Sequence, residues 1–255
     1  MRTIIIASLL ALLWSCSAEP PSEGAEAANP KDAAASVIQQ ALQAHGSTLL
    51  DSSTVQFRFR KYAYEAERQG GQYRYTRTFV SEDGDTIRDQ LTNDALRRSI
   101  NGEPVELSAK DSAAYAGSVN SVVYFALLPY FLQDPAVQTE YLGETTIKGE
   151  AYDKIKVVFR QEGGGTDYED EYVYWFHRGR HTMDYLAYNY QVNGGGARFR
   201  EAYNVRNING LRIADYRNYK PKGDSRAVAT FDSLFEAGSL EQVSLIETEN
   251  VSLRQ

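Results

Sequence analysis

The sequence predicts a mainly β (α+β) fold. We expect a curled antiparallel sheet or incomplete β-barrel of about ten or more strands, because a sheet of that width must curl. An N-terminal helix and a central helical insertion would pack on its concave side. Two observations indicate sheet. The chain has 18 Tyr against two Met, and Tyr favours half-buried sheet surfaces. Alternating apolar and polar residues also recur, separated by turns rich in Gly, Asn and Asp.

The first 16 residues are typical of a lipoprotein signal peptide. Arg2 precedes an apolar run from Ile4 to Trp14, and Leu13-Trp14-Ser15-Cys16 has the form of a lipobox. The run is too short to cross about 30 Å of hydrocarbon. We expect residues 1–15 to be removed and Cys16 to be acylated, which would anchor the protein to a membrane. An ordinary signal peptide with a chance cysteine is the alternative.

Residues 16–31 are expected to be a flexible tether, because no large apolar side chain follows Cys16 in this segment. Residues 32–255 would then form a single half-barrel domain. Ser17 and Ala18 provide no Asp directly after the cysteine, which favours the outer membrane as the location in the cell envelope. The net charge of −7 argues against nucleic acid as a partner.

The N-terminal part of this domain should be a helix followed by hairpins. Asp32 would cap a helix that runs to about Leu50. Val55 to Arg60 and Tyr73 to Phe79 then alternate as strands with one wet face do. Hairpin turns are expected at three places that tolerate positive φ: Gln69-Gly70-Gly71, Asp83-Gly84-Asp85 and Asn101-Gly102.

The period changes between Ala109 and Asp134, where a dense apolar stretch runs from Val119 to Leu132. We expect a buried helix covered on more than one face, with Pro129 kinking it or separating two helical turns. Strands then resume over six segments and in two weaker ones after Arg226. The six are Val137 to Ile147, Ala151 to Gln161, Asp170 to His177, Met183 to Val192, Ala197 to Arg206 and Leu211 to Lys220.

Several segments together resemble an uncharacterised lipoprotein family of the Bacteroidota, which has no established activity. They are Ser118 to Val137, Tyr141 to Glu144, Glu171 to Phe176, Met183 to Tyr190 and Arg198 to Arg206. The order of elements is also similar to the lipoprotein-carrier (Lol-type) superfamily. That resemblance implies an incomplete barrel, plugged by helices, with an apolar cavity for acyl chains.

Large side chains on the strand faces that we assign inward are the candidate walls of such a cavity. Both faces of Tyr172 to His177 are apolar or amphipathic, so one would meet the helices and the other a cavity or partner. A closed core with aromatic residues outside is the alternative. The candidate ligand-binding residues are Phe57, Phe59, Tyr75, Phe79, Phe125, Phe131, Phe159, Tyr174, Phe176, Tyr188 and Tyr203.

Arg198, Arg200 and Arg206 alternate along one predicted strand. Such a row either receives an anionic head group at the cavity mouth or pairs with carboxylates on adjacent strands. Asp215 and Glu201 are the candidate partners, and cross-strand pairing is the favoured interpretation.

No motif in the chain indicates catalysis or a bound metal. His177 and His181 flank Arg178-Gly179-Arg180, which has the character of a hairpin tip and places positive charge beside any cation. His45, near the end of the first helix, is expected to interact with the helix carboxyl end. There is no nucleophile elbow or phosphate-binding Gly loop. We therefore expect no cofactor, no metal and no enzymatic activity.

Three functions remain open. The first is a membrane-anchored protein that binds a lipid or acyl chain without converting it. The second is an envelope assembly module with a filled core and an unknown protein partner. The third and weakest is a hydrolase that uses paired carboxylates, whose separation a sequence does not show. An open apolar cavity, a packed interior and a cleft with converging acids would distinguish them.

Overall fold

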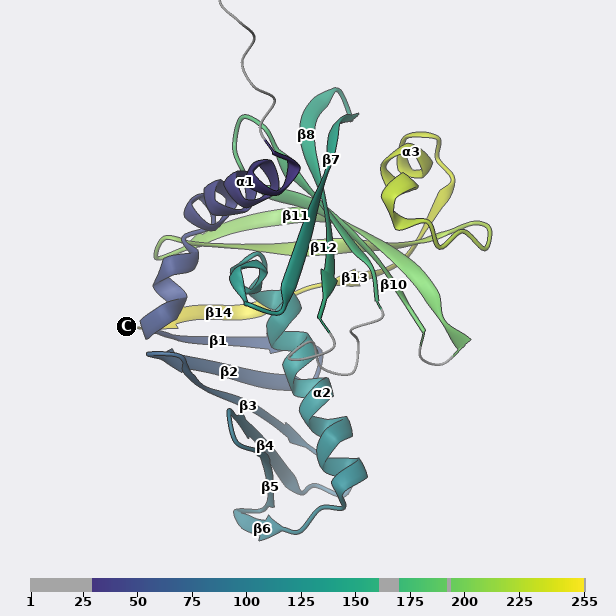
Figure 1. Ribbon diagram of the computed structural model, residues 1–255. Helices are drawn as coiled ribbons and strands as arrows, with labels where there is room; N and C mark the ends of the chain where they lie inside the picture. Colours follow the sequence, from purple (N-terminus) through teal and green to yellow (C-terminus); the bar gives the residue numbers. More distant parts are fainter. Residues whose placement is uncertain (1–28, 161–169, 192–193, 255) are drawn as a thin grey trace, which may run out of the picture.

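Two antiparallel sheets form the framework of the computed structural model, which describes residues 29–160, 170–191 and 194–254. Each sheet has seven strands (Figure 1). The N-terminal sheet has the order β14 (Glu249–Arg254), β1 (Thr54–Phe59), β2 (Tyr62–Gln69), β3 (Gln72–Val80), β4 (Thr86–Thr92), β5 (Leu96–Ile100) and β6 (Glu103–Val105).

In the C-terminal sheet, strands that are consecutive in the sequence are neighbours. Its order is β13 (Leu240–Ile246), β12 (Leu211–Pro221), β11 (Gly196–Ile208), β10 (Met183–Tyr190), β9 (Tyr172–His177), β8 (Glu150–Phe159) and β7 (Val137–Ile147). The predicted mainly β fold with an unclosed, curled antiparallel architecture is confirmed. The six strands predicted after Pro135 all form, and the two weaker ones are β13 and β14.

The first helix, α1 (Pro30–Ala44), is shorter than predicted. Asn29, rather than Asp32, caps it by accepting a hydrogen bond from the Lys31 N–H at 3.1 Å. The helix does not continue to Leu50, because Gly46 adopts a left-handed conformation with φ of 67°. A separate 3₁₀ helix, η1 (Ser47–Ser52), follows.

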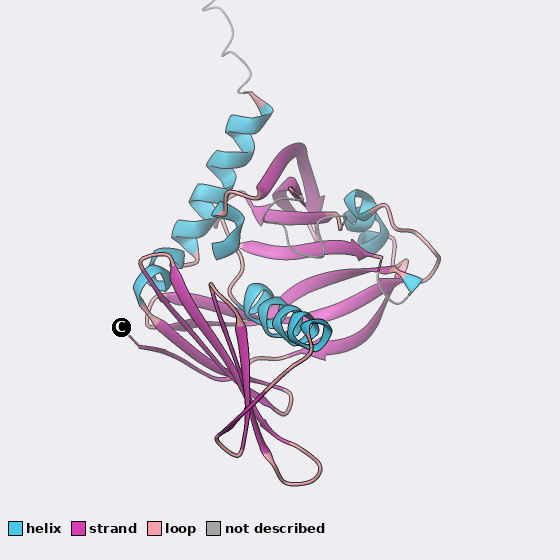
Figure 2. Cartoon of the chain, turned by 60° about the horizontal axis from the view of Figure 1, so that its bottom comes forward, coloured by secondary structure: helices cyan, strands magenta, loops and turns pink. Residues whose placement is uncertain are grey.

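The central insertion is α2 (Ala109–Ala126), followed by a cis Leu128–Pro129 bond and the 3₁₀ helix η2 (Tyr130–Gln133). Figure 2 shows α2 in the angle between the two sheets. Its first half is mostly exposed, whereas the stretch from Val119 onwards packs against both sheets. This matches the predicted helix covered on more than one face. Among the described residues, no helix combines the length and apolar character needed to cross a bilayer.

The C-terminal sheet is covered by helices on both faces, whereas we expected helices on one face of Tyr172 to His177 and a cavity or partner on the other. On one face α1 and η2 pack against Tyr174 and Phe176. On the other, the helices η4 (Val228–Thr230) and α3 (Phe231–Glu236) pack against Trp175 and its neighbours. These two helices were not predicted from the sequence. Figure 1 shows α3 on the side of this sheet away from α1.

Candidate ligand-binding cavity

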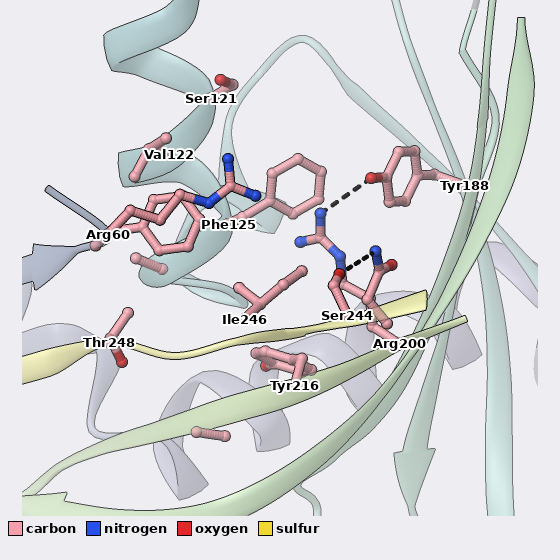
Figure 3. Close-up of a pocket in the computed structure, with 14 residues that line it drawn as sticks. Arg60, Ser121, Val122, Phe125, Tyr188, Arg200, Tyr216, Ser244, Ile246 and Thr248 are labelled. Carbon is pink, nitrogen blue, oxygen red and sulfur yellow. Dashed lines mark hydrogen bonds between the residues drawn. The ribbon is translucent and has the colours of Figure 1, made fainter. Parts of the chain in front are cut away.

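A cavity of about 380 Å³ lies between the two sheets, where α2 passes from one to the other (Figure 3). Its walls come from four regions. These are the end of β1 and the following turn (Phe59, Arg60), the second half of α2 (Ser121, Val122, Phe125, Ala126), three neighbouring strands β10 to β12 (Tyr188, Arg200, Ala214, Tyr216, Asn218), and β13 with the residue that leads to β14 (Ser244, Ile246, Thr248).

Regular backbone periods explain why these side chains converge. Val122 and Phe125 are three residues apart on α2 and therefore share a face of the helix. On β12, Ala214, Tyr216 and Asn218 are two residues apart and point to the same side of the strand. Arg60 is exposed, so the cavity reaches solvent at the end of β1. Most of the remaining wall is apolar or aromatic.

Arg200 is the charged group at the inner end of this cavity, away from Arg60 at the solvent end (Figure 3). Its side chain belongs to a residue that is only 9% exposed. One guanidinium nitrogen donates to the Tyr188 hydroxyl at 2.9 Å, and the guanidinium lies 4.3 Å from the centre of the Phe125 ring. Its Nε–H is buried without a hydrogen-bond partner in the part of the chain that the structure describes.

The polar groups of the cavity gather around Arg200. Asn218 is its direct neighbour across β11 and β12, and the Asn218 amide donates to the Ser244 hydroxyl at 3.1 Å. Figure 3 shows Arg200, Tyr188 and Ser244 at one end of the cavity and Val122 with Arg60 at the other. None of the described lining residues is Asp, Glu, His or Cys. The described lining thus presents no carboxylate pair of the kind that most glycoside hydrolases use.

Three of the eleven predicted wall residues line the cavity: Phe59, Phe125 and Tyr188. The other eight lie elsewhere. Phe57, Tyr75 and Phe131 are buried in the cluster under the N-terminal sheet, Tyr174 and Phe176 in the cluster under the C-terminal sheet with Phe159 at its margin, and Phe79 is half-buried on β3 against Tyr62.

Tyr203 lies on the face of β11 opposite to Arg200, because the two positions differ by an odd number of residues in a regular stretch of the strand. There its hydroxyl donates to Glu247 at 2.8 Å and Arg217 stacks on its ring. Tyr203 is therefore outside the cavity.

The row of three arginines predicted on one strand face is broken by a β-bulge. The register with β12 shifts between Tyr203 and Arg206, which turns Arg206 to the other face. Arg206 pairs with Asp215 at 2.7 Å, as expected for cross-strand pairing. Glu201, the other candidate partner, pairs with Lys148 and Arg217 instead. Arg200 keeps its place in the cavity wall.

Sequence reasoning missed several lining residues, mainly on β12 and β13. On each strand the missed residues are two positions apart and therefore share a face: Tyr216 and Asn218 on β12, and Ser244 and Ile246 on β13. Asn218 and Ser244 were a signal, because each is polar and lies two residues from an apolar or aromatic lining side chain, Tyr216 or Ile246. Their proximity to Arg200 depends on the pairing of β11, β12 and β13. A local sequence pattern does not predict this pairing.

The described residues contain no group of three or more His, Cys, Asp or Glu that could hold a metal ion. His177 is buried, and its Nε2 lies 3.1 Å from a Glu150 carboxylate oxygen. Its Nδ1 accepts from the backbone N–H groups of Gly179 and Arg180. The imidazole therefore holds the tip of a hairpin. The sequence also has an acidic run, Asp167, Glu169, Asp170 and Glu171, which we interpret as a solvated loop, and Asp167 and Glu169 lie outside the described residues.

The two curled sheets with helices on the concave side define a LolA-like half-barrel. A LolA superfamily protein from Nitrosomonas europaea superposes with a TM-score of 0.51 and 12% identity, over 87% of this chain and 94% of that one. A putative outer membrane lipoprotein-sorting protein domain from Vibrio parahaemolyticus has a TM-score of 0.47 and 6% identity, over 88% and 94% of the two chains.

The chain matches the model of the family of unknown function DUF6503 over residues 3–248 and belongs to that family. No curated protein matches it. Both resemblances seen in the sequence are thereby confirmed, the one to a family without established activity and the one to the lipoprotein-carrier fold.

Proposed function

We propose that this chain is a membrane-anchored lipoprotein of the cell envelope whose domain binds an amphiphilic ligand, a lipid or acyl chain, without converting it. The observation that carries the proposal is the cavity between the sheets, with an apolar wall and a small polar end. The half-barrel architecture supports it, since the lipoprotein-carrier superfamily that the chain resembles has the same fold.

The size of the cavity limits the ligand. Its volume of about 380 Å³ is at the lower end of the range of about 300–1,000 Å³ that small-molecule sites occupy. An acyl chain of about ten methylenes loses about 8 kcal/mol when it leaves a bilayer, at about 0.8 kcal/mol per methylene. Burial of the same methylenes in the cavity would offset this loss. One acyl chain or a small amphiphile fits this volume better than a lipid with several long chains.

Native mass spectrometry of the purified, detergent-free protein tests binding directly. We expect an additional lipid-sized mass, lost on unfolding, whose identity follows from organic extraction. A protein that stays free of added mass after incubation with envelope lipids would contradict the proposal.

A cavity-filling substitution links any bound mass to this site. Ala214 lines the cavity, and Ala214→Trp should occupy most of the space that an acyl chain needs and abolish binding of a neutral apolar dye. Val80→Trp is the matched control, because Val80 is 59% exposed and pairs with Thr86 at the end of β3, and neither residue lines the cavity. Equal dye binding by both variants would place the ligand elsewhere.

The anchor is a separate part of the proposal and rests on the sequence. Residues 1–15 would be the signal peptide, Cys16 the acylated residue and 16–31 the tether, and the outer membrane the location. We expect wild-type protein in the membrane fraction with incorporated labelled palmitate. Cys16→Ser should incorporate none, and equal labelling of the two proteins would refute lipidation at this residue.

An envelope interaction module is the second candidate function, and one observation favours it. Val243 and Leu245 are 42% and 48% exposed on β13, an edge strand of the C-terminal sheet. Apolar residues on an exposed edge suit contact with another protein. This second function would be supported if the protein stays ligand-free and co-purifies with a defined envelope protein. The Val243→Lys variant should then no longer bind that protein.

A further inference from the structure

We propose that the Arg200 end of the cavity binds an anionic head group, so that the ligand is an anionic amphiphile such as a fatty carboxylate or an alkyl phosphate. The inference rests on the proposed function and names the ligand class of the same cavity. It follows from the charge, the hydrogen bonding and the surroundings of Arg200.

The first observation is that Arg200 has no carboxylate partner in the described part of the chain. Three other buried or half-buried arginines do have one. Arg77 pairs with Asp89 at 2.6 Å, Arg212 with Asp184 at 2.9 Å and Arg206 with Asp215 at 2.7 Å. Arg200 contacts a phenol oxygen and two aromatic rings instead. A buried cation is costly unless it is paired, so an anion is the group that this position lacks.

The second observation is the presence of further donors at the right place. The Ser244 hydroxyl accepts from the Asn218 amide, which leaves its own O–H available to donate into the cavity. The Tyr188 hydroxyl accepts from Arg200, and among the described residues its own O–H has no acceptor, so it can also donate. A guanidinium flanked by two hydroxyl donors is a set that matches the oxygens of a carboxylate or a phosphate.

The third observation is the charge of the whole wall. The chain carries 34 acidic residues and a net charge of −7, yet the described lining includes two arginines and no acid. Arg60 lies at the solvent end, where its guanidinium is 5.0 Å from the centre of the Phe59 ring. Arg60 therefore adds positive potential at the entrance, and Arg200 provides it at the inner polar end.

The test compares head groups on one tail. Dodecanoate, dodecyl phosphate, dodecanol and dodecylammonium are titrated into the purified protein, and displacement of a bound neutral dye gives each affinity. We expect one or both anions to bind on the order of 10- to 100-fold more tightly than dodecanol, as charged hydrogen bonds provide. Dodecylammonium should bind most weakly. The preferred anion then distinguishes a fatty acid from a phosphorylated lipid as the source.

Two variants assign the preference to Arg200. Arg200→Met retains an unbranched apolar side chain beside Phe125, so the variant should bind the anions no more tightly than dodecanol. Arg198→Met is the matched control. It removes the same charge two residues away, from a side chain that contacts Tyr190 and not the cavity, and should leave all affinities as in the wild type.

The possible outcomes distinguish a failure of the head-group inference from a failure of the proposed function. Equal affinity of the wild type for dodecanol and dodecanoate overturns the inference about the head group and leaves the proposed function intact. An anion preference that persists in Arg200→Met also overturns it. Failure of every alkyl compound to displace the dye, or of the dye to bind, refutes the proposed function itself. The head-group series on the wild type decides the matter even where a variant does not fold.

Discussion

At the scale of single residues, His45 shows what burial does to a titratable group. It is 2% exposed, and its Nε2 accepts a hydrogen bond from the Met183 N–H at 3.0 Å. The proton of the neutral ring is therefore on Nδ1, which has no partner among the described residues. Burial, together with the positive charge of Arg212, lowers the pKa of His45 to about 3.

This lowered pKa predicts a loss of stability in acid. The unfolded chain takes up a proton on His45 near pH 6.5 and the folded chain only near pH 3. The stabilisation is complete above pH 6.5 and decreases as the pH falls towards 3. Between pH 7 and pH 5 the free energy of unfolding should decrease by about 2 kcal/mol through this group. Urea unfolding at the two pH values measures it.

His45→Gln provides the comparison, because an amide does not titrate and its oxygen can still accept from Met183. The variant should lose less stability than the wild type between pH 7 and pH 5, although it starts from a lower value. Carboxylates contribute equally to both proteins. Identical losses would mean that His45 does not titrate in this way.

Asp232 is a second residue whose role is defined by its surroundings. It is 2% exposed at the start of α3, and it accepts from Lys154 at 2.7 Å and from the Trp175 indole at 3.3 Å. Asp232→Ala should lower the free energy of unfolding by about 3 kcal/mol, since it leaves a mostly buried ammonium unpaired. Glu241→Ala breaks an exposed pair with Lys220 and should cost less than about 1 kcal/mol. Similar losses of stability for the two variants would contradict this role of Asp232.

At the scale of elements, Gly46 joins the end of α1 to the hairpin between β11 and β12. A Cβ at this position would lie 2.2 Å from the Gly210 carbonyl oxygen, and the His45 carbonyl accepts from the Arg212 N–H next to it. The close approach requires glycine both for its positive φ and for lack of space. The chain turns here instead of continuing the helix.

Gly46→Ala should therefore destabilise the protein by more than the conformational cost alone. Gly70 also has a positive φ, 56°, but open space around its Cα. Gly70→Ala should cost about 1 kcal/mol and Gly46→Ala several times as much, because backbone must move to admit its methyl group. Thermal unfolding of both variants measures the difference. Equal shifts in Tm would show that the Gly210 contact is not rigid.

Elements were predictable from the sequence where a local period is strong. Val55 to Arg60 and Tyr73 to Phe79 follow two-residue alternation, and the apolar run around Phe125 indicated the central helix. The end of α1 at Gly46 was missed because the apolar pattern continues through Leu49 and Leu50. The bulge in β11 was missed because one extra residue leaves no mark in composition. This bulge places Arg206 on the opposite face of β11 from Arg200.

The cavity was only partly predictable. Phe59, Phe125 and Tyr188 are large side chains at positions correctly assigned inward, but equally large ones such as Tyr174 fill the core. Which inward side chains face space and which face one another depends on how two sheets meet. The helix α3 was also missed, although Phe231, Leu234 and Phe235 have helical spacing. It is too short for the period to be clear.

At the scale of the whole molecule, the link from β13 to β14 and the helix α2 both join the two sheets. The chain passes from β13 to β14 through two residues, and β14 pairs with β1 at the edge of the N-terminal sheet. The helix α2 packs on the N-terminal sheet through Val119 and Val123 and reaches the C-terminal sheet through Phe125, which contacts Tyr188. The cavity lies where these connections cross, so its shape depends on both sheets.

This arrangement predicts that the two sheets unfold together. Trp175 is fully buried in the C-terminal sheet, and the chain has only one other tryptophan, Trp14. Protein without residues 1–15 lacks Trp14, and its tryptophan fluorescence therefore reports on the C-terminal sheet alone. Leu91→Ala removes a buried side chain from the N-terminal sheet and should cost about 2–4 kcal/mol.

If unfolding is cooperative, Leu91→Ala shifts the urea midpoint of Trp175 fluorescence as much as that of far-ultraviolet circular dichroism, which follows all strands. Val205→Ala, an exposed site, is the control and should shift neither. A fluorescence midpoint that stays in place while the dichroism signal splits into two transitions would show independent sheets. Coupled sheets hold the cavity walls at fixed separation, and independent sheets would allow it to open.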